Sequence, residues 1–158
     1  MIRTLFRQTL IPAPIDEVFQ FFSKAENLNR ITPPYLQFTI LPPLPLTLNK
    51  GVLINYRIKL QGIPMKWKTE ITHWNPPYSF QDTQLKGPYL LWKHLHVFKA
   101  AGNSTVMTDK VYFRIPGFIF EPLLYRLFIS QKLNEIFNYR EIIIRDIFSK
   151  QNVTAFNN

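Results

Sequence analysis

The chain contains no cysteine. This absence excludes disulfide bonds, thiolate catalysis and cysteine-based zinc sites. The five glycines are scattered, so the sequence has neither a phosphate-cradling glycine loop nor a cofactor fingerprint. It also lacks a recognisable arrangement for an activated nucleophile. We therefore expect no bound cofactor, and any enzymatic activity would have to use general acid–base chemistry.

Long apolar runs are missing too. No run approaches the roughly 20 residues of a transmembrane helix. Residues 1–14 mix arginine and glutamine with apolar residues and do not form a signal peptide. A cytoplasmic protein is the expectation. Its 158 residues can bury a substantial core in one domain, and an aromatic content of 15% argues against disorder over most of the length.

Runs of like charge are also absent, although the formal net charge is +9. Nucleic-acid-binding modules concentrate lysine and arginine on one face. Here the basic residues are spread thinly, which is more typical of solubility or of a weak attraction to anionic surfaces. We therefore expect no nucleic-acid partner.

The spacing of apolar residues predicts the order of elements. We expect a first strand over residues 2–11, two short helices before residue 31, a short strand over 37–41 and a proline-rich loop over 42–49. Five alternating runs between residues 51 and 116, joined by short turns, predict an antiparallel meander. From residue 121 to about 148 the period becomes helical. The fold class is α+β, with one domain over 1–148 and a flexible tail over 149–158.

One predicted strand carries two histidines among aromatic residues. Trp92, His94, His96 and Phe98 follow at period two and therefore share one face of the sheet. Because Phe98 belongs inside, the histidines should lie inside with it, where they need partners or line a cavity. They could bind a polar ligand head, transfer a proton, or only rigidify the sheet. We find no third ligand close enough in the sequence to predict a metal site.

Two carboxylates and an arginine are expected on buried faces. Asp82 and Asp109 alternate with apolar residues in their strands, and Arg140 lies within the apolar stripe of the last helix. A buried carboxylate must be paired or its pKa rises until it is neutral. The three residues are therefore either a structural ion-pair network or the polar end of a ligand pocket.

Further candidates line the proposed pocket. A sheet that grips a helix without filling the space between them leaves an elongated cavity. The aromatic residues could either stack on a ligand there or form ordinary core, and Gln84 shares its strand face with Asp82. The complete set of predicted ligand-binding residues is Tyr56, Trp67, Asp82, Gln84, Trp92, His94, His96, Asp109, Phe137 and Arg140.

An apolar stretch covers residues 116–128, around the start of the last predicted helix. It could dip into a membrane interface, pack on the two short N-terminal helices, or form a dimer contact. Its membrane-facing candidates are Phe118, Phe120, Leu124, Leu127 and Phe128.

Several motifs resemble one bacterial and cyanobacterial branch of the SRPBCC superfamily, which comprises START, Bet v 1 and polyketide cyclase-like proteins. The order of elements is similar to its helix-grip fold. The likeness covers residues 1–148, and the P-x-x-x-V-F opening is common throughout the superfamily. The motifs are PIDEVF at 14–19, LNRITPP at 28–34, GIPMKW at 62–67, GPY at 87–89 followed by Trp92, His94 and Phe98, TDKVY at 108–112, and FNYR at 137–140.

The resemblance implies an internal hydrophobic cavity that binds a lipid, isoprenoid or polyketide-like molecule. Some members of the superfamily are cyclases, and others only carry or sense a ligand; catalytic residues are not shared across it. Two alternatives accompany ligand binding. One is a cofactor-free cyclase or dehydratase, with His94, His96 and Asp109 as catalytic candidates. The other is a membrane-associated lipid transfer or chaperone module.

Overall fold

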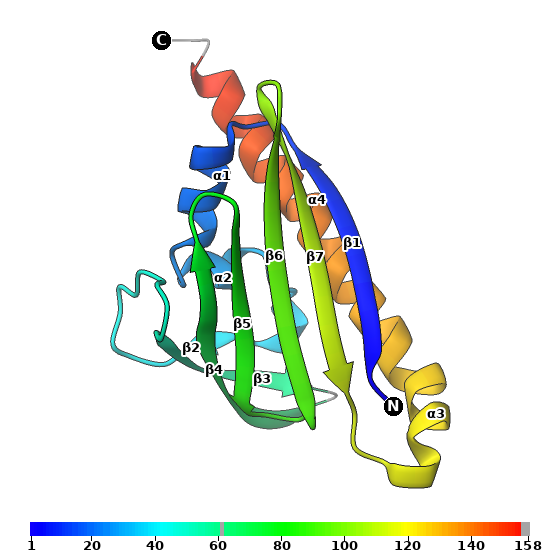
Figure 1. The fold of residues 1–158 in the computed structure, drawn as a ribbon. Helices are drawn as coiled ribbons and strands as arrows, with labels where there is room; N and C mark the ends of the chain where they lie inside the picture. Colours follow the sequence, from blue (N-terminus) through cyan, green and yellow to red (C-terminus); the bar gives the residue numbers. More distant parts are fainter. Residues whose placement is uncertain (61, 156–158) are drawn as a thin grey trace.

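The computed structural model describes residues 1–60 and 62–155, the last five by backbone only. Within this part of the chain, one antiparallel sheet has the strand order β1-β7-β6-β5-β4-β3-β2 (Figure 1). The last five strands follow one another as the predicted meander, which is confirmed. The strands are β1 (Arg3–Ile11), β2 (Thr39–Ile40), β3 (Leu53–Leu60), β4 (Ile63–Asn75), β5 (Ser79–Lys86), β6 (Leu91–Ala101) and β7 (Ser104–Arg114).

The sheet has one buried face and one face toward solvent. On β7 the residues alternate between partly exposed and buried over most of its length, as a period of two requires. The long strand β4 shifts its register against β5 between Lys68 and Thr69 and again between Ile71 and His73. Such irregularities bend and twist a strand. They help the sheet to curve around the elements on its buried face.

The two predicted N-terminal helices are present. Helix α1 (Ile15–Phe22) begins directly after Pro14 and carries Asp16 and Glu17 in its first turn. Negative charge at this end of a helix interacts favourably with the helix dipole. A shorter helix, α2, spans Asn27–Arg30. The sequence did not predict the 3-10 helix η1 (Pro34–Leu36), which forms where consecutive prolines fix the backbone.

The C-terminal helix predicted from residue 121 is present, and a π-helical turn lies within its first part. The 3-10 helix η2 (Phe118–Phe120) is followed without a break by α3 (Glu121–Leu124) and the π-helical turn η3 (Tyr125–Ile129). The long helix α4 then runs over Ser130–Ala155. The tail predicted from residue 149 is therefore helical as far as Ala155, and residues 156–158 lie outside the described part. No helix among the described residues is both long and apolar enough to cross a bilayer.

Helix α4 extends along the sheet and, with α1 and α2, provides the second layer (Figure 1). Two groups of buried side chains join the layers. One surrounds Phe22, Phe98 and Ile144 beside α1, and the other surrounds Trp92 and Phe137 near the start of α4. The helix-grip fold, a curved antiparallel sheet around a long C-terminal helix, is confirmed.

Candidate ligand cavity

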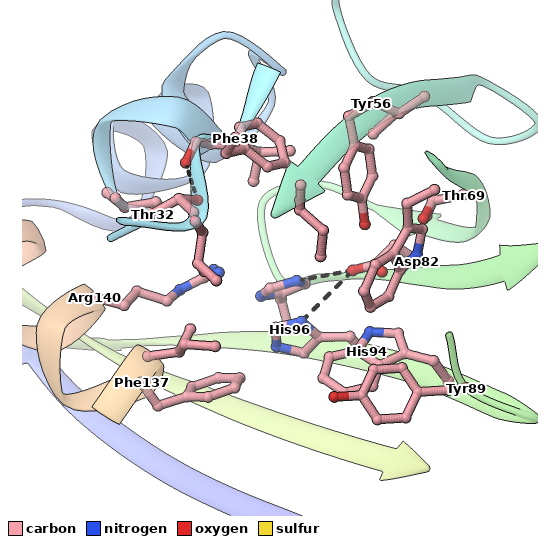
Figure 2. A pocket seen from close by; sticks show the side chains of 18 of the residues that line it. Thr32, Phe38, Tyr56, Thr69, Asp82, Tyr89, His94, His96, Phe137 and Arg140 are labelled. Atoms are coloured by element: carbon pink, nitrogen blue, oxygen red, sulfur yellow. Dashed lines mark hydrogen bonds and ion pairs between the residues drawn. The ribbon is translucent and has the colours of Figure 1, made fainter. Parts of the chain in front are cut away.

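A cavity of about 170 Å³ lies between the buried face of the sheet, helix α4 and the segment 28–38. Side chains from all three parts point into it (Figure 2). Several of its lining residues are partly exposed, Phe38, Leu60 and Ile136 among them. Eight of the predicted ligand-binding residues line it: Tyr56, Trp67, Asp82, Trp92, His94, His96, Phe137 and Arg140.

Gln84 and Asp109 are not among the lining residues. The Gln84 amide nitrogen donates a hydrogen bond to the carbonyl oxygen of Tyr89 at 2.7 Å, so this side chain holds the turn before β6. Asp109 lies on β7, behind the histidines, with its side chain 3% exposed. The alternation of a strand correctly places Asp109 on the buried face, but it does not show how deep a side chain lies.

Aromatic rings form the apolar wall. The rings of Tyr56 and Trp67 stack with centroids 5.6 Å apart and planes 19° from parallel. Trp92 meets Trp67 edge to face at 5.6 Å. Phe38 lies 4.8 Å from Tyr56, and Tyr89 lies 4.6 Å from Trp92. These interlocking rings hold one another in place and form an apolar wall of the cavity.

The strand register brings the polar residues together. His94 stands opposite Asp82 of β5, and its strand neighbour His96 stands opposite Asp109 of β7. Both histidines are therefore flanked by both carboxylates. Helix α4 adds Arg140 from the other layer, and Figure 2 shows Asp82, His94, His96 and Arg140 pointing toward one another. We call Asp82, His94, His96, Asp109 and Arg140 the polar cluster.

Short contacts connect the imidazoles to the carboxylates. His94 Nε2 lies 2.7 Å from Asp109 Oδ1, and His96 Nε2 lies 3.3 Å from Asp82 Oδ2. These are hydrogen bonds from ring N–H groups to carboxylates. His96 Nδ1 is also 2.9 Å from Asp109 Oδ1, without the alignment of a hydrogen bond. His94 Nδ1 is 3.7 Å from Asp82 Oδ2 and takes part in no such bond.

The surroundings shift the pKa values of the two histidines in opposite directions. Burial lowers the pKa of His94, and the neighbouring charge of His96 lowers it further. Burial also opposes the charged form of His96, but its contacts with Asp109 and Asp82 outweigh this effect and raise its pKa. Burial would raise the pKa of Asp109, yet the charge of Arg140 and the contacts with His94 and His96 hold this pKa well below its usual range. His96 is thus the imidazole that is easier to protonate, and His94 is the more readily neutral one.

Arg140 carries unused donors. Its side chain is 12% exposed, and its Nη2 comes within 3.9 Å of Asp109 Oδ1. Its Nε and Nη2 atoms are buried and have no hydrogen-bond partner among the described residues. Its guanidinium carbon lies 5.5 Å from the ring centroid of Phe22 and 6.0 Å from that of Phe137. A buried guanidinium with free donors at the wall of a cavity is suited to an anionic ligand group.

Two tyrosines and a tryptophan add neutral polar groups. Burial raises the pKa of Tyr56 well above its usual value, and burial likewise raises the pKa of Tyr89. Both therefore remain uncharged phenols near neutral pH. The indole Nε1–H of Trp67 is buried without an acceptor in the described part of the chain. Phenol and indole groups can give hydrogen bonds to a ligand without adding charge.

Three members of the polar cluster could also hold a cation. Asp82, His94 and His96 each offer one ligand atom, and these atoms lie within 4.8 Å of one another. The sequence supplied no third ligand for the two histidines, whereas the strand pairing brings Asp82 to them. A divalent ion at this point would compete with the proton on His96 and with the hydrogen bond between His96 and Asp82.

Sequence reasoning missed part of the wall. Leu36 lies in the 3-10 helix η1, which no sequence pattern predicted, and Phe38 lies in the short strand expected over residues 37–41 but was not proposed as a contact. Tyr89 was visible in the GPY motif but was not proposed as a contact. Leu133 and Ile136 belong to the apolar stripe of the last helix and could have been included on that signal.

No curated protein sequence matches the chain. Among solved structures, the fold is similar to Zhui, an aromatase/cyclase from a Streptomyces species, with 14% identity, a TM-score of 0.74 and 96% of each chain covered. It is also similar to major latex-like protein 151 from Panax ginseng, with 14% identity, a TM-score of 0.66 and coverage of 93% of this chain and 97% of that one.

A third similar structure is a nucleoside-diphosphate sugar epimerase from Corynebacterium glutamicum, with 20% identity and a TM-score of 0.70. The match covers 96% of this chain but 30% of the epimerase, so only a part of that protein shares the fold. These likenesses confirm the SRPBCC resemblance at the level of fold. The family model described as polyketide cyclase / dehydrase and lipid transport matches residues 11–135, which is more than half of the sequence, and the chain therefore belongs to this family.

Proposed function

We propose that this protein binds a compact hydrophobic small molecule that carries an anionic or hydroxylated group. The observation that carries the proposal is the pair of unused, buried Arg140 donors at the polar end of an otherwise apolar cavity. Buried donors without partners are unfavourable unless something else satisfies them. A carboxylate or a similar head would do so, while the apolar part of the ligand contacts Trp67, Trp92 and Phe137.

The size of the cavity limits the ligand. A cavity of about 150 Å³ accommodates benzene, so the 170 Å³ found here suits one or two rings or a short branched chain. A longer polyketide or lipid would have to extend past Phe38 and Ile136 or move the wall apart. We therefore favour a small aromatic or isoprenoid acid over a long-chain lipid.

Calorimetric titration with two matched probes tests this proposal. 2-Naphthoate carries the carboxylate, and 2-naphthalenemethanol replaces it with a neutral hydroxymethyl group. We expect the parent protein to bind both, and naphthoate more tightly. Arg140→Met should weaken the binding of naphthoate by about tenfold or more, as expected for a lost charged hydrogen bond. The affinity for the alcohol should be nearly unchanged.

Arg145→Met is the matched control, because Arg145 lies on the same helix but is half exposed and paired with Glu141. It should bind both probes like the parent. Equal affinity of the parent and Arg140→Met for naphthoate would contradict the role of Arg140. Failure of the parent to bind either probe, together with no co-purifying small molecule in native mass spectrometry, would contradict ligand binding.

A second function, carbon–carbon bond formation by acid–base catalysis, is supported by His94. Its Nε2–H is held by Asp109, which leaves Nδ1 as the basic atom of the neutral ring. Such a base could take a proton from the carbon between two carbonyl groups, and the resulting enolate could attack a further carbonyl to close a ring. The protonated His94 would then return the proton to the alkoxide formed from that carbonyl. Protonated His96 or Arg140 could stabilise the enolate oxygen.

The test is turnover of a short poly-β-ketone thioester, followed by mass spectrometry. Loss of product in His94→Gln, with normal product in a His73→Gln control, would support catalysis. His73 is suitable because it lies on the exposed side of β4, where its Nε2 contacts Ser79. Product formation no faster than in buffer would exclude this reaction for that substrate.

A further inference from the structure

The segment before α4 lies at one end of the molecule (Figure 1). Its large apolar side chains are exposed to solvent. Phe118 is 94% exposed, Ile119 74% and Phe120 63%. Packing on the two N-terminal helices, one of the arrangements considered from the sequence, does not account for this exposure. Soluble proteins rarely expose a contiguous apolar patch without a partner for it. The remaining exposed apolar residues of the segment are Leu123, Leu124, Leu127 and Phe128.

The backbone presents this surface at a conformational cost. Gly117 has φ +132°, and Phe118 follows with φ +47°, in the left-handed region that bulky residues rarely adopt. The Phe118 side chain gains little burial in return, because it is almost wholly exposed. Local strain of this kind is often kept where a residue has a function rather than a structural role.

The patch extends beyond the segment itself. Phe118 and Ile119 share a surface depression with Met1, Leu90 and Arg114, so residues from three parts of the chain meet there. Met1 is 82% exposed and Leu90 59%. The apolar surface is therefore built by the fold and is not confined to one loop.

The charges around the patch are positive. Between Asp109 and Glu135 the sequence has a single carboxylate, Glu121. Glu121 is buried and accepts a hydrogen bond from Arg3 Nε at 2.8 Å. Arg114 and Arg126 are exposed beside the apolar side chains, and the whole chain carries a net charge of +9. An apolar surface edged by arginine complements a bilayer with anionic headgroups.

We propose that residues 118–128 dock on the surface of an anionic lipid bilayer. Phe118, Ile119 and Phe120 enter the boundary between headgroups and acyl chains, while the arginines remain at the level of the phosphates. On the inner side of the same helical segment, Tyr125 and Ile129 pack on the buried cluster that contains Trp92 and Phe137, two residues of the cavity wall. Docking would therefore bring this buried cluster close to the membrane surface. This proposal does not depend on the ligand.

Vesicle co-sedimentation tests the proposal. The vesicles contain phosphatidylcholine alone or phosphatidylcholine mixed with phosphatidylglycerol. The parent should pellet with the anionic vesicles, and added salt should reduce the bound fraction. The variant Phe118→Asn/Ile119→Asn should lower the partition coefficient by about tenfold or more, since two apolar side chains no longer enter the lipid. Asparagine tolerates the left-handed backbone conformation at position 118, so the thermal midpoint of the double variant should not fall below that of the parent.

Ile142→Asn is the matched control. Ile142 is an equally exposed apolar residue at 66%, but it lies about 20 Å further along the C-terminal helical segment than Phe128. It should bind vesicles like the parent. Equal binding of the parent and the double variant would overturn the proposal. Equal binding of the parent to neutral and to anionic vesicles would also overturn it. A parent that is dimeric without vesicles, and becomes monomeric in the double variant, would identify a second copy of the chain as the partner instead.

Discussion

The guanidinium of Arg140 approaches the carboxylate of Asp109 to 3.9 Å, from Nη2 to Oδ1, without forming a hydrogen bond to it. At this distance the charge of the arginine still lowers the pKa of the carboxyl group. Its Nε and Nη2 donors have no hydrogen-bond partner in the described part of the chain, while His94 and His96 contact Asp109 at 2.7 and 2.9 Å. The contact between helix and sheet is therefore electrostatic, and the hydrogen-bonding capacity of the arginine is left for a ligand.

Arg140→Met should reduce the free energy of unfolding by about 1–3 kcal/mol, because the buried Asp109 carboxylate loses the attraction of a cation at 3.9 Å although no hydrogen bond is broken. A larger loss, of about 3–5 kcal/mol, is expected when a buried charge loses its only partner. Asp109 keeps both histidine contacts in this variant, so the smaller range applies. Urea unfolding checks the value. Arg140→Lys, which retains a charge, should recover part of the loss; a variant as stable as the parent would show that the Asp109 contact contributes nothing.

Asp109→Asn and Asp82→Asn should differ sharply in stability, although each removes one carboxylate from the same two histidines. Asp109 is 3% exposed, and its replacement leaves His96 and Arg140 without their shared anion, at a cost of about 3–5 kcal/mol. Asp82 is 18% exposed and lines the cavity, so its replacement should cost only about 1 kcal/mol. Urea unfolding of both variants provides the comparison. Equal losses would contradict the view that Asp109 is structural and Asp82 faces the ligand.

The sequence was most informative where a pattern repeats locally. Period-two alternation correctly predicted that His94 and His96 share a buried face with Trp92 and Phe98. The helical stripe correctly placed Arg140 toward the sheet. In both cases the backbone geometry of a single element decides the direction of a side chain, so neighbouring residues alone are sufficient.

Other features depend on distant parts of the chain. Gln84 continues the alternation that includes Asp82, but the turn before β6 draws its amide to Tyr89. Asp82 became a possible third cation ligand only through the register between β5 and β6. The sequence showed that residues 118–128 are apolar, but it could not show that no other element covers them. Pairing register and coverage by other elements are properties of the whole fold.

Stability should depend on pH in two opposite ways around the ordinary histidine pKa of 6.5. His96 has a raised pKa in the folded protein, so its stabilising contribution is complete below 6.5 and is lost as pH rises through the folded value. His94 has a lowered pKa, so its contribution is present above 6.5 and is lost as pH falls below it. Asp109 adds a further loss on the acid side, as pH falls from its ordinary value through its lowered folded value.

Urea midpoints measured across this range should therefore pass through a maximum near neutral or slightly acidic pH. His96→Gln should remove the decline on the alkaline side, because glutamine cannot lose a proton there. A parent midpoint that climbs steadily through and above the ordinary histidine pKa would show that His96 is not held in its protonated form.

Filling the cavity should separate ligand binding from stability. Ile58 is buried and lines the cavity, so Ile58→Phe can place its ring in unoccupied space. We expect the free energy of unfolding to rise by about 0.5–2 kcal/mol, or at least not to fall, while 2-naphthoate binding is lost.

Ile144→Phe is the control: Ile144 is fully buried in the packed core beside α1 and does not line the cavity. Because Ile144 is fully buried among other core side chains, the same substitution there should cost about 1–3 kcal/mol. Urea unfolding and calorimetry measure both quantities, and an Ile58→Phe protein that is as unstable as Ile144→Phe would mean that rings already fill the space between sheet and helix.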